Sequence, residues 1–88
     1  MTDHQKMRML AYDWHGGQNS PLYSFASCGG VVHTEEHRTQ LAVEIRDNIA
    51  WCEANPARDE AEDLSALREL LAFVMAAPSN GEEAPFPS

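Results

Sequence analysis

The sequence predicts a mainly α-helical domain, in which a short N-terminal extended segment and a short helix pack on an antiparallel helical hairpin. Apolar residues recur at three- and four-residue steps over two long C-terminal segments, and Asn55-Pro56 separates these segments. A chain of 88 residues with 43% hydrophobic and 23% charged side chains suits one globular domain. We expect this domain to span residues 1–77, and the proline, glycine and charge of residues 78–88 predict a flexible tail.

Two short elements are expected before the hairpin. Residues 7–14 alternate roughly between apolar and polar side chains, which indicates an extended segment. Ser20 and Pro21 combine a capping hydroxyl with a proline suited to a first turn, and the glycines at 29–30 supply a left-handed stop, so a two-turn helix is predicted between them. Residues 31–32 are a brief extended stretch, and their pairing with residues 7–14 would give a minimal two-stranded β element.

The first helix of the hairpin is predicted from Thr34, as its cap, to about Ala54. Two glutamates follow Thr34, and the helix dipole favours negative charge in this first turn. Val43 and Trp51 are expected to point away from the apolar stripe of the helix. The stripe consists of Leu41, Ala42, Ile45, Ile49 and Cys52.

The second helix of the hairpin is predicted from about residue 56 or 59 to Ala77. Its connection to the first helix is short, which implies antiparallel packing. Leu70 is expected to widen its apolar stripe. The stripe itself consists of Leu64, Leu67, Leu71, Val74 and Met75.

The charge of the chain is −8 and is unevenly distributed. Residues 1–33 sum to zero, so the whole excess of acids lies in residues 34–88. Such a surface repels nucleic acids and anionic membranes, because both require clustered lysine and arginine. No apolar run approaches the roughly 20 residues that cross a bilayer, and residues 1–6 lack the apolar core of a signal peptide. We therefore expect a cytoplasmic protein with reduced cysteines that binds neither nucleic acid nor membrane directly.

The best candidates for metal ligands are His15, Cys28, His33 and His37, which are residue types that zinc accepts. A structural zinc site usually has paired ligands two to four residues apart at both ends, and this pattern lacks them. With Thr34 as the helix cap, His33 lies outside the helix and should not share a face with His37. The prediction is therefore no metal and no cofactor, with a small zinc-binding structural domain as the alternative function.

Two further patterns contain residue types found in catalytic sites, and neither favours an enzyme. Cys28 falls at the C-terminal end of the short helix, where the dipole disfavours the thiolate that a cysteine nucleophile needs. The acids at the start of the last helix complement its dipole and are expected to face water. These acids are Asp59, Glu60, Glu62 and Asp63. We predict that the protein is not an enzyme.

An aromatic segment is the feature that most favours a binding function. Residues 12–25 hold four of the seven aromatic side chains, in a charge-poor region rich in turns. Tyrosine and tryptophan combine a large apolar area with a hydrogen-bonding tip, as protein-binding surfaces require. The alternative is that these rings close one end of the hairpin. The predicted protein-binding residues are Tyr12, Trp14, His15, Tyr23 and Phe25, together with the acids Asp59, Glu60, Glu62 and Asp63.

Residues 11–18 and 20–30 resemble segments of short uncharacterised open reading frames of bacterial phages and prophages. The resemblance covers about a third of the chain and carries no catalytic motif. It implies a small accessory protein that binds a host or phage protein. One version is an inhibitor of a basic nucleic-acid-binding enzyme, since carboxylates along a helix can imitate a phosphate backbone.

Self-association is the other partner expectation. A two-helix hairpin with wide apolar stripes can bury its second side in a homodimer. Val43, Leu70 and Phe73 are the candidates for such a contact, because they are expected to point off the main stripes.

Overall fold

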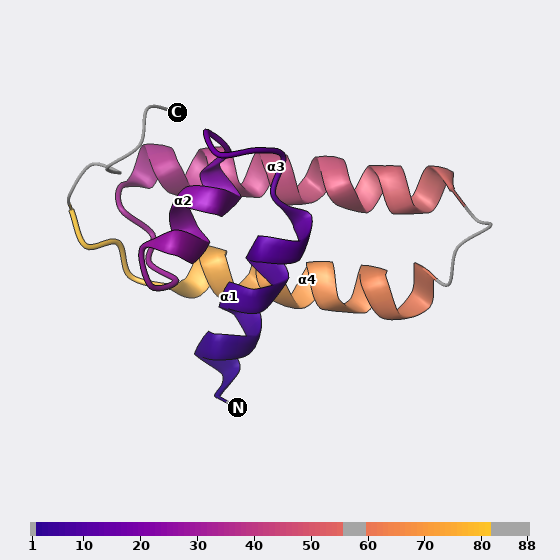
Figure 1. Cartoon of the computed structure of the whole chain (residues 1–88), viewed down its shortest axis with the longest axis horizontal. Coiled ribbons are helices and arrows are strands. Elements are labelled where there is room, and N and C mark those ends of the chain that lie inside the picture. The colour runs from indigo at the N-terminus through magenta and orange to yellow at the C-terminus, as the bar shows by residue number, and fades with distance from the viewer. Residues whose placement is uncertain (1, 56–59, 82–88) are drawn as a thin grey trace.

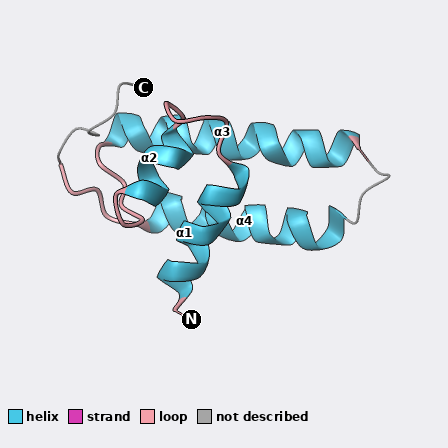
Figure 2. Ribbon diagram, in the orientation of Figure 1, coloured by secondary structure: helices cyan, strands magenta, loops and turns pink. Residues whose placement is uncertain are grey.

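Four α-helices form the regular structure of the part of the chain that the computed structural model describes, residues 2–55 and 60–81. They are α1 (Asp3–Trp14), α2 (Pro21–Ser27), α3 (Glu35–Ala54) and α4 (Glu60–Ala76). No β-strand occurs within these described residues (Figure 2). The mainly α-helical class is therefore confirmed, and the start predicted for the last helix at residues 56–59 lies outside the described residues.

Helices α3 and α4 lie side by side and antiparallel, and they form the predicted hairpin (Figure 1). Helices α1 and α2 cover the end of the hairpin where α3 begins and α4 ends, with α1 packed on α2 and α4, and α2 packed on α3. All four helices contribute to one core. Its buried members are Met7, Ala11, Leu22, Phe25, Ala26, Val32, Leu41, Ile45, Cys52, Leu67, Leu70 and Val74.

The apolar stripes agree with the prediction except at two positions of α4. Leu70 is fully buried in the core and is not a side chain at the edge of the stripe. Met75, which was placed on the stripe, is 49% exposed. The helix is therefore rotated slightly from the expected register, so that Leu67, Leu70 and Val74 face α3 at three- and four-residue steps.

The prediction of an extended segment over residues 7–14 is wrong, because these residues belong to α1. Thr2 and Gln5 form a capping box: Thr2 Oγ1 accepts from the backbone N–H of Gln5 at 3.1 Å, and Gln5 Oε1 accepts from the N–H of Thr2 at 3.0 Å. The inward side of the helix is apolar, with Met7 and Ala11 buried. The roughly alternating pattern thus concealed a helix with one buried side.

Polar contacts fasten both ends of α1 to the rest of the fold. The ring Nε2–H of His4 donates to the carbonyl of Gly30 at 3.0 Å, and Asn48 Nδ2 donates to the carbonyl of Trp14 at 3.0 Å. Gly30 has φ = 75°, and a Cβ atom there would lie 2.6 Å from His4 Nε2. Only glycine therefore allows the N-terminal contact in this form.

Helix α2 has the predicted boundaries, with Ser20 as its cap and a glycine pair after it. Ser20 Oγ accepts from the backbone N–H of Tyr23 at 3.1 Å. Glu44 of α3 adds two contacts, since its carboxylate accepts from the N–H of Leu22 and from that of Gly16, each at 2.9 Å. One carboxylate thus fixes the start of α2 and the loop before it against α3.

The predicted pairing of residues 31–32 with the N-terminal segment is also wrong. Val32 instead forms an isolated parallel bridge with Ser79, and the N–H of Asn80 donates to the carbonyl of Val32 at 3.0 Å. Backbone contacts of the fold therefore continue beyond residue 77, the expected end of the domain. The rest of the predicted tail, residues 82–88, lies outside the described residues.

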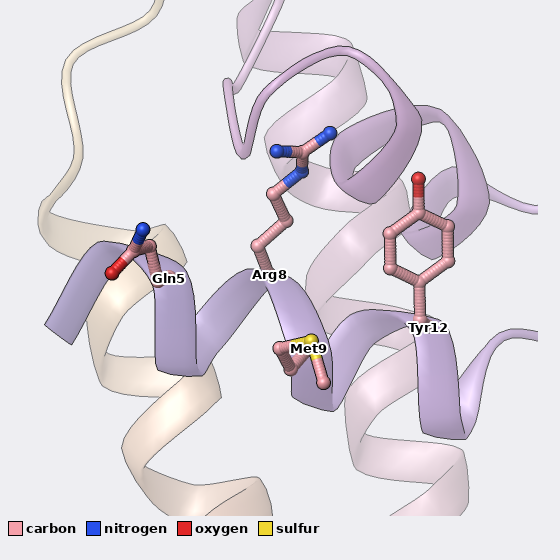
Figure 3. Close-up of a pocket in the computed structure, with 4 residues that line it drawn as sticks. All are labelled: Gln5, Arg8, Met9 and Tyr12. Carbon is pink, nitrogen blue, oxygen red and sulfur yellow. The ribbon is translucent and has the colours of Figure 1, made fainter. Parts of the chain in front are cut away.

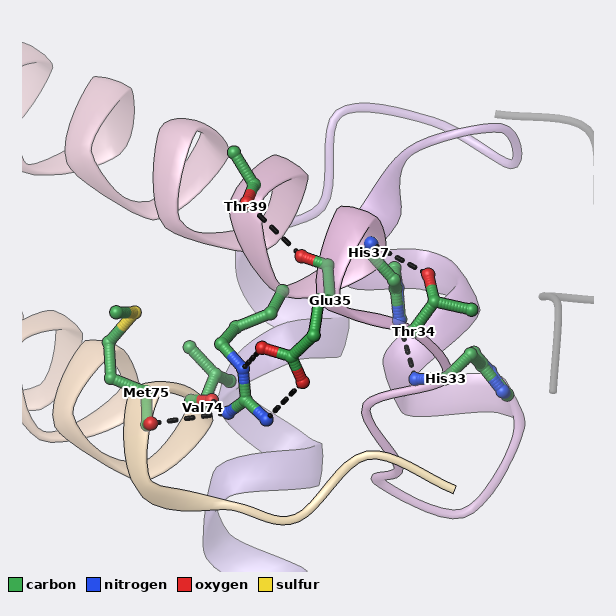
Figure 4. A network of polar contacts seen from close by, with 8 residues as sticks. His33, Thr34, Glu35, His37, Thr39, Val74 and Met75 are labelled. Carbon is green, nitrogen blue, oxygen red and sulfur yellow. Dashed lines mark hydrogen bonds and ion pairs between the residues drawn. The ribbon is translucent and has the colours of Figure 1, made fainter. Parts of the chain in front are cut away.

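Arg38 joins the start of α3 to the end of α4, and its partners Glu35, Val74 and Met75 are labelled in Figure 4. Its guanidinium makes a bidentate contact with Glu35 at 2.9 and 3.0 Å, which lowers the pKa of that carboxyl. Nη1 also donates to the carbonyls of Val74 and Met75 at 2.6 and 3.2 Å. These carbonyls are in the last turn of α4, so Arg38 satisfies acceptors that lack partners within the helix.

The packing of the core predicts how the loss of a side chain from α4 changes the free energy of unfolding at one buried and one exposed position. Leu67→Ala should lower the free energy of unfolding by about 2 to 5 kcal/mol, because it leaves a cavity at a fully buried site. Met75→Ala, at an exposed site of the same helix, should change it by about 0.5 kcal/mol or less. Urea unfolding followed by circular dichroism measures both values, and equal losses would contradict this packing of α4.

Candidate protein-binding surface

The outward side of α1 carries a continuous stripe of side chains, formed by Gln5, Arg8, Met9 and Tyr12. Their positions follow the steps i, i+3, i+4 and i+7, so they share one side of the helix. Together they line a shallow groove of about 580 Å³ that is open to solvent. Figure 3 shows Arg8 and Tyr12 projecting from the same side of α1, with Met9 between them along the helix. We call these four residues the α1 stripe.

Two rings extend the α1 stripe towards the start of α2. Tyr23 stands edge-on to Tyr12, with ring centroids 6.3 Å apart, and His15 stands edge-on to Tyr23 at 5.1 Å. Such edge-to-face pairs hold aromatic side chains in defined orientations. Tyr12 is exposed, whereas Tyr23 and His15 are half-buried. The surface therefore runs from the N-terminal turn of α1 to the first turn of α2.

The structure assigns the other predicted aromatic residues to the interior or its edge. Phe25 is fully buried and packs edge-on against Phe73 with centroids 6.3 Å apart, so it cannot contact a partner. Trp14 is half-buried and packs against the core. The aromatic segment of the sequence thus divides into a core part and a surface part.

Two of the four predicted acidic residues, Glu62 and Asp63, are described with their side chains, and both lie on α4. Glu62 is exposed and Asp63 is half-buried. Asp59 lies outside the described residues, as does the side chain of Glu60. Neither Glu62 nor Asp63 is among the described residues that line the groove of the α1 stripe.

Sequence reasoning missed Gln5, Arg8 and Met9 as members of the surface. It treated residues 7–14 as extended, which separates neighbours that the helix brings together. A signal for the helix was present, because Thr2 followed three residues later by Gln5 is the pattern of a capping box.

Arg8 is the member of the stripe with the most defined geometry. Its Nε–H donates to the carbonyl of Ala26 in the last turn of α2 at 2.6 Å. Nη1 and Nη2 make no hydrogen bond or ion pair within residues 2–55 and 60–81. The backbone contact therefore holds the guanidinium in place and leaves Nη1 and Nη2 without a partner among these residues.

A second groove, of about 470 Å³, lies where α2 begins against α3. Its apolar centre is Val43, which is 53% exposed and agrees with the sequence prediction. Of the other candidates for self-association, Leu70 is fully buried and Phe73 is half-buried against Phe25. Only Val43 of the three therefore presents a large apolar surface to solvent. The groove is lined by Ser20, Pro21, Thr39, Gln40, Val43, Glu44 and Asp47.

The histidines of the zinc hypothesis do not form a metal site. The rings of His33 and His37 lie closer than the sequence suggested, with centroids 4.9 Å apart. Across the described part of the chain, however, no three histidine, cysteine or acidic residues are placed to hold a metal ion. Both ring nitrogens of His37 are also occupied by backbone partners, the N–H of His33 (Figure 4) and the carbonyl of Pro21. The arrangement of these described residues therefore does not support the zinc alternative.

His37 is instead a structural connector between α2 and α3. Its Nδ1 accepts from the N–H of His33 at 3.0 Å, so its Nε2 carries the proton and donates to the carbonyl of Pro21 at 3.1 Å. Burial lowers the pKa of His37 below its usual 6.5; the Pro21 carbonyl opposes this shift, and His33 adds to it. The ring is thus held in its neutral form.

No helix in the described ranges is long and apolar enough to cross a membrane. Comparisons of the chain with protein-family models, curated proteins and solved structures found no match.

The lowered pKa of His37 predicts a loss of stability in mild acid. Above pH 6.5 both the folded and the unfolded chain hold this ring neutral, so its contribution is complete. As the pH falls below 6.5, the unfolded chain takes up a proton that the folded chain resists, and stability declines by at most about 1.4 kcal/mol per pH unit.

Urea unfolding at pH 7.5, 6.5 and 5.5 measures this effect. The wild-type chain should lose more stability over this range than His37→Gln, which lacks the titrating ring. His15→Gln is the control and should keep the wild-type slope. Parallel losses in wild type and His37→Gln would show that His37 is not responsible.

Proposed function

We propose that the chain is a non-enzymatic interaction module that binds another protein through the α1 stripe and the adjoining rings of Tyr23 and His15. The observation that carries this proposal is the stripe itself. Gln5, Arg8, Met9 and Tyr12 line one groove on the solvent-facing side of α1. Met9 is 55% exposed and Tyr12 is 40% exposed, so both offer apolar area for burial by a partner.

The rigid mounting of the stripe supports binding. The opposite side of α1 is buried at Met7 and Ala11, and contacts of His4 and Asn48 hold the helix ends. A partner would therefore meet a surface that is already ordered, and little conformational entropy is lost on association. Methionine adds adaptability, since its flexible side chain fills irregular gaps.

The acidic helices contribute the second part of the proposal, which concerns the class of partner. Exposed carboxylates on α3 and α4 favour partners with clustered lysine and arginine, and a basic nucleic-acid-binding protein of a host or phage is such a partner. Inhibition by occupation of its nucleic-acid site is the corresponding activity. Among the side chains that the structure describes, the exposed carboxylates of α3 and α4 are Glu35, Glu36, Asp47, Glu53, Glu62 and Glu69.

Capture from a lysate of the native host tests the use of the α1 stripe. A double variant, Met9→Ser with Tyr12→Ala, should lose the proteins that the wild-type chain retains, by at least about tenfold, because two apolar contacts are removed. The matched control is Met75→Ser with Trp51→Ala, which removes similarly exposed apolar groups, 49% and 46%, from other helices. Circular dichroism verifies that both variants fold. Equal retention by the two double variants would contradict the proposal.

The salt dependence of the captured complex tests the partner class. A partner held by the acidic helices should dissociate at least about tenfold more readily at 0.5 M than at 0.1 M salt, because ions screen exposed charges. A complex whose dissociation is unchanged over this range would exclude a basic partner held by the acidic helices. The α1 stripe would then remain as the proposed contact.

A further inference from the structure

We propose that Arg8 is the specificity residue of the α1 stripe and binds a single carboxylate, an aspartate or glutamate side chain of the partner, between apolar contacts at Met9 and Tyr12. This inference rests on the proposed function and names the chemistry of the partner segment. Its evidence is the placement of donors along the groove.

The guanidinium of Arg8 is fixed along one edge and open along another. Its Nε–H is used by the carbonyl of Ala26 at 2.6 Å, which orients the plane of the group. Nη1 and Nη2 have no partner in the described residues. These two nitrogens can receive both oxygens of a carboxylate, and such forked contacts are stronger and more directional than contacts of a lysine.

Two further donors belong to residues that line the same groove. Gln5 uses its Oε1 for the capping box, which leaves its amide nitrogen as a donor. Figure 3 shows this amide nitrogen and the hydroxyl of Tyr12 on the same side of α1 as the guanidinium. The described lining of the groove thus offers these donors on the same side of α1 as Arg8, together with the apolar side chain of Met9.

The charge around Arg8 favours one carboxylate over a nucleic-acid backbone. Lys6, the other cation of α1, is paired with Glu69 at 3.1 Å, and Asp3 and Asp13 leave the helix without net charge. A phosphate backbone needs several cations in a row. A single acidic side chain needs one arginine and gains from the apolar neighbours that exclude water around the ion pair.

Two short peptides test the inference on the full chain. The probes are acetyl-Leu-Glu-Leu-amide and acetyl-Leu-Gln-Leu-amide, which differ only in the charged group. Nuclear magnetic resonance follows the Nε–H signal of Arg8 and the side-chain amide of Gln5 during titration. The signal of Arg38 is an internal control, because Glu35 already occupies its guanidinium.

We expect saturable shifts of Arg8 with the glutamate peptide, at an affinity about tenfold or more above that of the glutamine peptide. Arg8→Lys should reduce this difference, because it keeps the charge and loses the forked contact. Arg68→Lys, at an exposed arginine of α4, should retain it. The comparison of the two peptides on the wild-type chain stands even if Arg8→Lys weakens the contact with α2.

Three results would overturn the inference. Equal affinities for the two peptides would exclude recognition of a carboxylate by Arg8. They would not contradict protein binding through the α1 stripe. If neither peptide shifts the Arg8 signal at about 10 mM, Arg8 does not bind such side chains. The capture experiment would still decide the proposed function. Shifts of Arg8 that depend on the concentration of the chain alone would assign the groove to a second copy.

Discussion

The burial of one side of α1 decides which residues of this helix face solvent. Met7 and Ala11 lie one turn apart and are almost wholly buried in the common core. The small side chain of Ala11 lets the helix backbone approach its neighbours closely. Once this side is inward, the helical repeat of 3.6 residues turns Gln5, Met9 and Tyr12 outward. The binding surface is therefore a consequence of how α1 packs.

The hairpin could be predicted from the sequence because its signals are local and agree with one another. Thr34 marks the start of α3, and the repeat of apolar residues over α3 and α4 fixes their inward sides. Helix α1 was predicted as an extended segment because its short apolar pattern fits both the two-residue period of a strand and the 3.6-residue period of a helix. As a helix, its inward stripe consists of Met7, Leu10, Ala11 and Trp14. The capping box at Thr2 would have favoured the helix.

The candidate surface could be predicted only in part, because tertiary contacts decide which rings are inside. Tyr12 and Phe25 belong to the same aromatic segment, and nothing in their local sequence separates an exposed ring from a buried one. Phe25 is inward because it meets Phe73 of α4, a contact between residues far apart in the chain. The link from Arg8 to Ala26 and the bridge from Val32 to Ser79 are likewise long-range. Local periodicity carries no information on such pairs.

The orientation of α1 can be measured by the access of a soluble paramagnetic agent to the methionine methyl groups. Residues two apart share a side in an extended segment and lie about 200° apart around a helix, so Met7 and Met9 distinguish the two conformations. If α1 packs as described, the agent broadens the methyl signals of Met9 and Met75 and leaves that of Met7 sharp, in keeping with exposures of 55%, 49% and 4%. Equal broadening of Met7 and Met9 would contradict this packing and the surface that depends on it.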